Sequence, residues 1–349
     1  MNAASRPTSE VAPAVLADYG AICRNALQGY LAVQADRGAE YLGAAIRDYP
    51  DRGGRSLRAS LCIAVARAFG AATEDAVRTA TALEMLHNAF LIHDDIEDAS
   101  EERRGQPTLH RLHGVPIAIN VGDALTVLSL RPLLENRDSL GLRVSLRILE
   151  EAERMARETV EGQAIELGWR RENAVDLGEQ DYLRMVLKKT CWYTMIFPLR
   201  VGALIGTRDG LELDEFLRFG FFLGAAFQIQ DDVLNLIGDQ KQYGKELAGD
   251  LREGKRTLIV IHAMNQASPA ERARLTQLLA LEPEQKQPRD LLWLRELIER
   301  HDSIEYARQV AHGLAGAASL ECERLFRDLP EGRDLQFVRE LPSWVIRRS

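Results

Sequence analysis

The sequence predicts an all-α protein that folds as a single-domain helical bundle. Apolar residues recur at three- and four-residue spacing along most of the chain, as they do on helices that bury one face. We find no runs of Val, Ile and Thr that alternate with polar residues, the pattern typical of strands. No convincing linker divides the 349 residues. We expect residues 1–12 to be a disordered lead and residues 13–349 to form the domain.

The composition disfavours several classes of protein. The formal net charge is -8, whereas a protein that binds nucleic acid is normally basic. The four cysteines are scattered and form no CxxC pair, which fits a reducing cytoplasm. The N-terminal residues lack the basic and apolar blocks of a signal peptide. The longest uncharged apolar run, residues 219–229, is too short to span a bilayer. We therefore expect a cytoplasmic protein without a membrane span.

The first part of the chain predicts a helix followed by an anion site. A helical pattern extends from about Leu16 to Ile46 and ends at a turn that contains proline. Two glycines at 53–54 then open a turn before a strongly apolar helix. Arg55 and Arg58 lie three residues apart at the start of this helix, where an anion would find both the helix N-terminus and two guanidinium groups. Solvated arginines at an ordinary helix start would give the same pattern.

The next predicted helix, from about 74 to 98, ends in an aspartate-rich motif. Asp94 and Asp98 lie four residues apart, so on a helix they share one face at a distance of ~6 Å. A run of aspartates is usually a solvated helix face. Here the motif follows a strongly apolar stretch, where unpartnered carboxylates are costly and a divalent cation with oxygen ligands would stabilise them. Arg103 and Arg104 follow closely and suit a diphosphate.

The middle of the chain predicts long buried helices that carry isolated polar residues. The expected helices cover residues 115–135, 138–170, 179–206 and 212–237. Gln163 and Glu166 share one face of the second of these helices. Lys189 interrupts an apolar run, and such a lysine either extends to water or points into a cavity. His87 and His93, on the helix of the aspartate motif, are more often structural than catalytic in such positions.

A second acidic motif repeats the spacing of the first. Asp231, Asp232 and Asn235 occupy positions i, i+1 and i+4 and also end a long apolar run. Two such motifs can face each other across a pocket and hold a small cluster of Mg²⁺ ions. A glycine-containing loop follows, with Lys245, Asp250 and Lys255. Further helices are expected over residues 257–349, interrupted by a loop at 282–288.

This ordered set of motifs resembles the trans-type isoprenyl diphosphate synthases of the polyprenyl synthetase family, and in particular its short-chain members. The resemblance is strong over residues 45–260 and implies the isoprenoid synthase fold, a helical bundle with a central active-site cavity. The matching motifs are Asp94–Asp98 with Arg103-Arg104, Asp231–Asn235 preceded by Phe227-Gln228, Gly53–Arg58, His87, Gln163, Lys189-Thr190, and the loop with Lys245, Asp250 and Lys255.

Three residues depart from the family's pattern. Arg55 stands where the family has lysine, which keeps the charge but changes its geometry. Asn235 replaces the last carboxylate of the second motif, so we expect weaker affinity for a third metal ion rather than loss of activity. Glu166 replaces the family's usual aspartate.

The resemblance implies a reaction that joins isopentenyl diphosphate to an allylic diphosphate such as dimethylallyl, geranyl or farnesyl diphosphate, with three Mg²⁺ ions. Metal binding falls to Asp94, Asp98 and Asp231, with Asp95, Asp232 and Asp250 close by. The resemblance implies that the allylic diphosphate is bound by Arg103, Lys189, Lys255 and Lys245. It implies that isopentenyl diphosphate is bound by Arg55, Arg58, His87 and Arg104. Thr190 and Gln228 would direct dipoles at the allylic cation. A homodimer is also implied, with the apolar helix at 117–133 as a candidate interface.

The length of the product depends on the residues that precede the first motif. Ala89 and Phe90 lie five and four residues before Asp94, and the resemblance implies that bulk at these positions shortens the product. Phe90 favours a C15 or C20 product, with geranylgeranyl diphosphate (C20) preferred. The alternatives are a terpene cyclase on the same fold, which would not need the isopentenyl diphosphate residues, and a non-catalytic regulatory subunit, which would be expected to lose aspartates.

Overall fold

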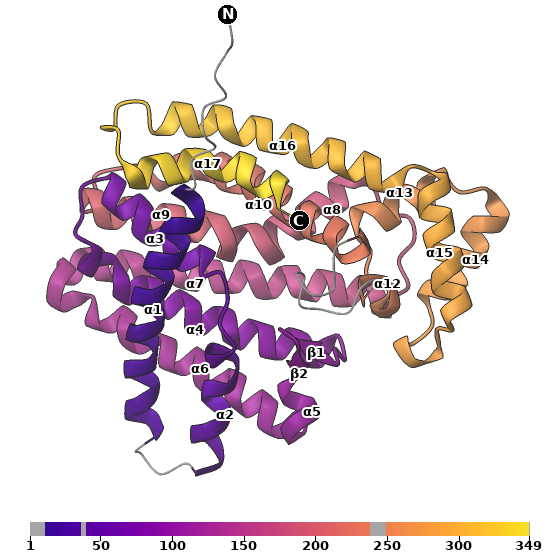
Figure 1. The fold of residues 1–349 in the computed structure, drawn as a ribbon, viewed down its shortest axis with the longest axis horizontal. Coiled ribbons are helices and arrows are strands. Elements are labelled where there is room, and N and C mark those ends of the chain that lie inside the picture. The colour runs from indigo at the N-terminus through magenta and orange to yellow at the C-terminus, as the bar shows by residue number, and fades with distance from the viewer. Residues whose placement is uncertain (1–10, 36–39, 238–248, 349) are drawn as a thin grey trace, which may run out of the picture.

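The computed structural model describes residues 11–35, 40–237 and 249–348, and these are almost entirely helical (Figure 1). The sheet in this part of the chain is a hairpin of two short strands, β1 (Glu102–Arg103) and β2 (Gln106–Pro107). The all-α prediction is confirmed. The helices are α1 (Val11–Ala35), α2 (Glu40–Asp51), α3 (Leu57–Ala68), α4 (Thr73–Glu97), α5 (Leu109–His113), α6 (Val115–Glu135), α7 (Arg137–Arg171), α8 (Glu179–Val186), η1 (Leu187–Ile196), α9 (Phe197–Thr207), η2 (Leu213–Glu215), α10 (Phe216–Ile237), α12 (Gly249–Glu253), α13 (Leu258–Gln266), α14 (Pro269–Leu279), η3 (Pro283–Gln285), α15 (Pro288–Arg300), α16 (Ser303–Leu325) and α17 (Arg333–Arg347).

The helices expected at 115–135, 138–170 and 212–237 match the observed bounds to within a few residues, whereas the N-terminal part differs. Helix α1 begins at Val11, so residues 11 and 12, which we expected in the disordered lead, are helical, and residues 1–10 lie outside the described part. The single helix expected from Leu16 to Ile46 consists of two helices, α1 and α2. The turn before α3 contains Gly53 with a φ of 75°, a value that glycine adopts without strain.

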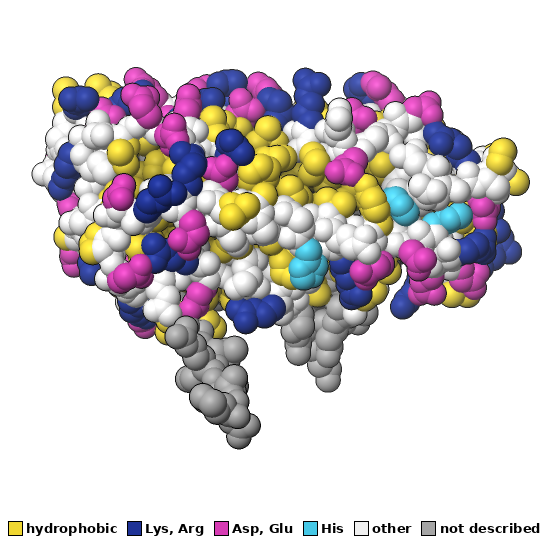
Figure 2. All heavy atoms as spheres, turned by 90° about the horizontal axis from the view of Figure 1, so that it is seen from above, with side chains coloured by type: hydrophobic (Ala, Val, Ile, Leu, Met, Phe, Trp, Pro, Cys, Tyr) yellow, Lys and Arg dark blue, Asp and Glu magenta, His cyan; other side chains and the backbone are white. Residues whose placement is uncertain are grey.

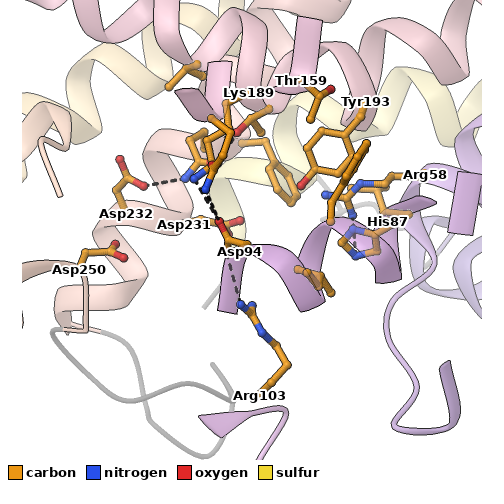
Figure 3. Close-up of a pocket in the computed structure, with 18 of the residues that line it drawn as sticks. Arg58, His87, Asp94, Arg103, Thr159, Lys189, Tyr193, Asp231, Asp232 and Asp250 are labelled. Atoms are coloured by element: carbon orange, nitrogen blue, oxygen red, sulfur yellow. Dashed lines mark hydrogen bonds and ion pairs between the residues drawn. The ribbon is translucent and has the colours of Figure 1, made fainter. Parts of the chain in front are cut away.

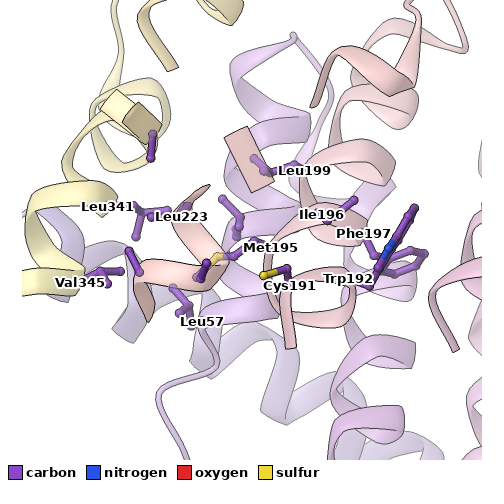
Figure 4. Packing of buried hydrophobic residues seen from close by; sticks show 14 of the residues in the cluster. Leu57, Cys191, Trp192, Met195, Ile196, Phe197, Leu199, Leu223, Leu341 and Val345 are labelled. Atoms are coloured by element: carbon purple, nitrogen blue, oxygen red, sulfur yellow. The ribbon is translucent and has the colours of Figure 1, made fainter. Parts of the chain in front are cut away.

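The interior contains one large apolar cluster and one smaller one. In the large cluster α3, η1, α9 and α10 pack together, and α16 and α17 cover them on one side (Figures 1 and 4). In the smaller cluster α4 packs against α6, with α1 and α2 beside them. Helix α4 contributes residues to both clusters. Both clusters hold the helices that carry the predicted site residues.

The surface combines charged rims with exposed apolar side chains. Seen from the side of α16, lysines, arginines, aspartates and glutamates surround hydrophobic side chains near the middle of the face (Figure 2). Helix α6 is long and apolar enough to cross a membrane by length and composition alone. A core helix of a globular protein passes the same test, and α6 packs along α4.

The helix expected over residues 179–206 has a π-helical middle, η1. Pro198 follows it and has no N–H, so the carbonyl of Thr194 loses the donor that it would have in an α-helix. Residues of η1 also lie very close to two neighbouring helices, because a Cβ on Gly162 of α7 would be 2.1 Å from the backbone nitrogen of Lys189 and one on Gly224 of α10 would be 2.8 Å from Cys191 Sγ. Such π segments are rare and occur frequently at functional sites.

Candidate active site

A cavity of about 1150 Å³ lies at the ends of α4 and α10. Both acidic motifs reach it, through Asp94 from α4 and through Asp231 and Asp232 from α10. Figure 3 shows these three carboxylates near Lys189 and Asp250, while Arg58, His87 and Tyr193 form a second group farther along the cavity. The predicted site residues that line the cavity are Arg55, Arg58, His87, Phe90, Asp94, Arg103, Arg104, Gln163, Glu166, Lys189, Thr190, Gln228, Asp231, Asp232, Asp250 and Lys255.

The three aspartates of the first motif lie in different surroundings. Asp94 lines the cavity, with Lys189 Nζ at 3.2 Å and Arg103 Nη2 at 3.5 Å. Asp95 is fully buried, pairs with Arg103 and accepts a hydrogen bond of 2.5 Å from the Tyr49 hydroxyl, so it holds the arginine rather than facing the cavity. Of the three aspartates, Asp94 is thus the one that lines the cavity, beside Glu97, whose carboxylate accepts a hydrogen bond of 2.5 Å from Gln163 Nε2.

The last aspartate of the first motif, Asp98, is also buried. Its two oxygens lie 2.6 Å from Arg170 Nη1 and 2.6 Å from Lys255 Nζ. It is not part of the cavity lining. The sequence placed Asp94 and Asp98 on one helical face as joint metal ligands, whereas here Asp98 is neutralised by two cations. Metal binding by Asp98 would require both cations to move.

The second motif is divided in a similar way. Asp231 pairs with Arg348 Nη2 at 2.9 Å. Asp232 accepts hydrogen bonds of 2.7 Å from the Tyr182 hydroxyl and 2.7 Å from Gln228 Nε2, and burial followed by repulsion from Asp250 raises the pKa of its carboxyl to about 8. Asn235 lies outside the cavity lining.

Asn235 contacts the backbone of the short helix α12. Its side-chain oxygen accepts a hydrogen bond of 3.2 Å from the backbone N–H of Asp250, and the residue is buried. The amide therefore holds the short helix α12, which carries Asp250 into the cavity. An amide oxygen serves this contact as well as a carboxylate would.

Two buried lysines face the acidic motifs. Lys189 pairs with Glu166 and Asp94, and although burial acts to lower the pKa of its ammonium group, these carboxylates raise it above the ordinary value. Lys255 lies 2.6 Å from Asp98 and 2.7 Å from Glu253, with the same outcome for its pKa. Both lysines are therefore charged and ready to meet a diphosphate. Lys245, also predicted here, lies outside the described residues.

The other end of the cavity is basic. Arg58 donates a hydrogen bond of 2.9 Å to Thr194 and lies 4.4 Å from the centre of the Tyr193 ring. Arg104 donates to the carbonyl of Tyr49, and a Cβ on Gly54 would come within 3.1 Å of its guanidinium group, so glycine leaves room for it. These two arginines, with Arg55, suit a second diphosphate.

His87 is the uncharged member of this basic end. Burial, followed by the positive charges of Arg58 and Arg104, lowers the pKa of its imidazole well below the ordinary value. The ring lies 3.4 Å from Arg58 Nη1 and stacks on Tyr193. His87 is therefore neutral at pH 7 and can donate a hydrogen bond without adding charge. His93 also lines the cavity, and its Nε2 lies 3.6 Å from Asp123 of α6.

The structure separates the two residues predicted to set product length. Phe90 lines the cavity and packs edge-on against Tyr193, with ring centres 5.9 Å apart. Ala89 is fully buried in the small apolar cluster and does not line the cavity. The prediction that Ala89 shapes the cavity wall therefore does not match its position, because one residue's step along a helix turns the side chain by about 100°.

Several cavity residues were missed by sequence reasoning. Tyr182 and Tyr193 lie on either side of the Lys189-Thr190 pair, and Trp344 and Arg348 come from the C-terminal end. Arg170 pairs with Asp98. The tyrosines follow the helical spacing of Lys189, which was a usable signal. The C-terminal residues gave no local signal beyond a basic end.

The chemistry of the cavity carboxylates fits Mg²⁺, which prefers oxygen ligands. Asp94, Asp231 and Asp250 line the cavity from three different elements. Among the described residues, no three carboxylates, imidazoles or thiols already converge as a metal site. Asp94 and Asp231 each pair with a cation instead, and a bound metal would have to replace these pairings.

Comparison with known proteins gives a consistent result. The family model described as polyprenyl synthetase matches residues 39–294. A short chain isoprenyl diphosphate synthase of Methanothermobacter thermautotrophicus is 35% identical over 259 residues, which cover 74% of this chain and 77% of the relative. Among solved structures, the geranylgeranyl pyrophosphate synthetase of Pyrococcus horikoshii is 29% identical with a TM-score of 0.83, covering 96% of this chain and 99% of the other.

A further structure carries ligands. The geranylgeranyl pyrophosphate synthase of Corynebacterium glutamicum, complexed with isoprenyl diphosphate and magnesium, is 25% identical with a TM-score of 0.84 and covers 95% of this chain and 99% of its own. The family match extends over most of the chain and agrees with the cavity described above. The chain therefore belongs to the polyprenyl synthetase family.

Proposed function

We propose that this prenyltransferase condenses isopentenyl diphosphate with an allylic diphosphate, in the presence of Mg²⁺, to give a short-chain all-trans prenyl diphosphate. The observation that carries the proposal is a single cavity with an acidic group around Asp94 and Asp231 at one end and a basic group around Arg58 and Arg104 at the other. An allylic diphosphate with its metal ions needs the first group. A second diphosphate without metal suits the second.

Separate groups of cavity residues would bind the metal and the two substrates. Bound Mg²⁺ would neutralise the allylic diphosphate so that its C–O bond can ionise, and Asp94, Asp231 and Asp250 are the described cavity carboxylates that would hold the metal. Lys189, Lys255 and Arg103 would bind the same diphosphate. The basic residues Arg55, Arg58, His87 and Arg104 would hold isopentenyl diphosphate. The released diphosphate can accept the final proton, so the reaction needs no separate protein base.

The product is proposed to be C20, with C15 as the alternative. Phe90 and Tyr193 pack against each other on the cavity wall, where they limit the space for a growing chain. The Pyrococcus structure bears the name of a geranylgeranyl synthetase and the Methanothermobacter relative that of a short chain synthase, and both names support a short product.

We also propose a homodimer with α6 at its interface. Helix α6 exposes Val127, Leu130 and Leu134, which lie on one helical face, and Leu142 and Leu146 at the start of α7 are exposed beside it. Exposed apolar side chains in a row on one helix are typical of an interaction site. A second copy of the chain would cover it. A cytoplasmic location is supported by the four free, buried cysteines.

Product analysis by mass spectrometry tests the function. The purified protein would be incubated with Mg²⁺, isopentenyl diphosphate and, in turn, C5, C10 and C15 allylic diphosphates. A single C15 or C20 diphosphate is the expected product. A cyclic hydrocarbon would instead identify a terpene cyclase, and no elongation from any starter would identify a non-catalytic subunit. Omission of Mg²⁺ is the matched control and should abolish turnover.

A further inference from the structure

Three hydrogen bonds join four residues of the cavity wall into one network. The Tyr182 hydroxyl on α8 donates to Asp232 Oδ2 at 2.7 Å. Gln228 on α10 donates from Nε2 to the other oxygen of Asp232, also at 2.7 Å. Thr190 on η1 donates from its hydroxyl to Gln228 Oε1 at 2.9 Å. These hydrogen bonds thus connect α8, α10 and η1 and end at Thr190, the residue beside Lys189.

The direction of these bonds is fixed by the chemistry of Asp232. Both of its oxygens accept hydrogen bonds here, so Gln228 turns its NH₂ group towards Oδ1. The amide oxygen of Gln228 then faces Thr190 and takes the hydroxyl's single proton. The lone pairs of the Thr190 oxygen then remain available as acceptors. Because Thr190 lines the cavity, they can face a bound substrate.

Three of these four residues are buried, and Gln228 is partly buried. Tyr182 is 1% exposed and Asp232 is 5% exposed. Each oxygen of Asp232 accepts one of these hydrogen bonds. Loss of one member would leave its neighbour with an unsatisfied buried polar group, and Gln228 would become free to rotate its amide.

We propose that Tyr182 and Asp232 are positioning residues that hold the oxygens of Thr190 and Gln228 towards the carbon that becomes positively charged. This inference rests on the proposed function. In that reaction the electron pair of the allylic C–O bond leaves with the diphosphate. The double bond of isopentenyl diphosphate then forms the new C–C bond, and the proton that restores the alkene is taken by the released diphosphate. Oriented oxygen dipoles stabilise the cation between these events.

The first test is Tyr182→Phe, which removes only the hydroxyl. We expect kcat for condensation to fall by about 10- to 100-fold, somewhat less than the loss of a whole preorganised polar group. The KM values of both substrates and the Mg²⁺ concentration for half-maximal rate should stay within about threefold, because the diphosphate and metal groups are untouched. An unchanged kcat, or a loss confined to KM, would overturn the proposal.

The second test asks whether Tyr182 acts through Thr190. Thr190→Val should slow kcat, and the double variant Tyr182→Phe/Thr190→Val should be no more than about threefold slower than Thr190→Val alone. Losses that multiply would show that the tyrosine acts elsewhere. Tyr19→Phe is the matched control, because it removes a buried tyrosine hydroxyl that donates to Asp334, and neither residue lines the cavity. It should leave kcat unchanged.

The third test separates positioning from metal binding and holds even if Tyr182→Phe folds poorly. In Asp232→Asn the introduced amide can donate to Gln228, which would reverse the polarity of the network and turn the Thr190 proton towards the cavity. We expect kcat to fall at least about tenfold below wild type, with half-maximal Mg²⁺ unchanged. A raised Mg²⁺ requirement would make Asp232 a metal ligand and overturn the proposal. If the wild-type protein itself makes no prenyl diphosphate, the proposed function fails rather than this inference.

Discussion

At the scale of single residues, the acidic side chains of the cavity pair with neighbouring basic side chains. Asp94 lies between Lys189 and Arg103, and Asp231 lies against Arg348. Each pairing satisfies a charge that would be costly to leave alone in a partly buried site. A diphosphate with bound Mg²⁺ presents the same charges in complementary order, negative to the lysine and positive to the aspartate. Ligand binding can therefore exchange partners without leaving a buried charge unpaired.

Removal of Asp94 tests this view of the acidic group. Asp94→Ala should lower condensation at least tenfold, because the site loses a metal ligand while Lys189 keeps Glu166 as a partner. The fold should survive, with a melting temperature close to wild type. Turnover with saturating substrates and thermal unfolding by circular dichroism are the measurements. Retention of more than about a tenth of the wild-type turnover would contradict the metal assignment. Asp138→Ala, an exposed aspartate on α7, is the control.

Phe90 tests the wall of the cavity. Phe90→Ala removes a ring that packs on Tyr193, so the growing chain gains room and the product should lengthen by at least one C5 unit. Mass spectrometry of the prenyl diphosphates measures the distribution. Phe222→Ala is the control, because this phenylalanine is also partly buried but does not line the cavity. If both variants give the wild-type distribution, Phe90 does not limit product length.

The sequence predicted Asp94 and Asp231 well because each ends an apolar helix, and such a helix can extend only to the edge of a core. It could not predict that Asp95 and Asp98 turn inward to Arg103, Arg170 and Lys255. Those partners come from other parts of the chain, and the direction of each side chain depends on how the helices pack. The same reason explains why neighbouring residues 89 and 90 face different surroundings.

At the scale of elements, the π-helix η1 shapes the reactive part of the cavity. It presents Lys189, Thr190 and Tyr193 to the cavity from consecutive turns. The apolar pattern of residues 179–206 predicted one continuous helix, and the backbone is indeed helical throughout. Hydrophobic periodicity cannot separate a π segment from an α-helix over ten residues. Pro198 is the local signal, but it fits the first turn of a new helix equally well.

The close contact between α7 and η1 can be tested at Gly162. A methyl group there would lie 2.1 Å from the backbone nitrogen of Lys189, so Gly162→Ala must push η1 away. We expect a loss of about 1–3 kcal/mol in the free energy of unfolding and at least a tenfold fall in kcat, because Lys189 and Thr190 move with the backbone.

The matched control lies on the same helix. Gly168 has open space around its Cβ position, so Gly168→Ala should raise the free energy of unfolding by up to ~1 kcal/mol through helix propensity. Its kcat should equal that of wild type. Urea denaturation and steady-state kinetics on both variants provide the comparison. Equal effects at the two positions would show that the contact with η1 has no special role.

At the scale of the whole molecule, α1 and α17, the first and last helices of the described residues, pack together. Tyr19 of α1 and Arg67 of α3 both donate to Asp334 of α17. Helix α17 then carries Trp344 and Arg348 to the cavity, where Arg348 lies 4.0 Å from the centre of the Phe227 ring. Contacts between residues more than 250 positions apart leave no trace in local sequence patterns, so this closure of the cavity was not predictable.

The exposed face of α6 gives the last prediction. Val127 is 66% exposed, and Leu134 lies two helical turns further on the same face, so an aqueous monomer would leave a row of apolar side chains in water. If a second copy covers this row, Val127→Glu/Leu134→Glu would bury four carboxylates in the interface, each at a cost of several kcal/mol unless it finds a partner. The dissociation constant of the dimer should rise by at least about 100-fold.

Light scattering coupled to size exclusion measures the mass of each species. The wild-type protein should elute at about twice the 39.1 kDa of one chain, and the double variant at the mass of one chain when loaded at micromolar concentration. Leu320→Glu is the control, because Leu320 is 75% exposed on α16, away from α6, and a charge there should leave the mass unchanged. A wild-type protein that elutes as a monomer, or a double variant that stays dimeric, would exclude α6 as the dimer interface. Since α6 also packs along α4, which carries Asp94, a monomeric variant with reduced turnover would further indicate that dimer formation supports the acidic end of the cavity.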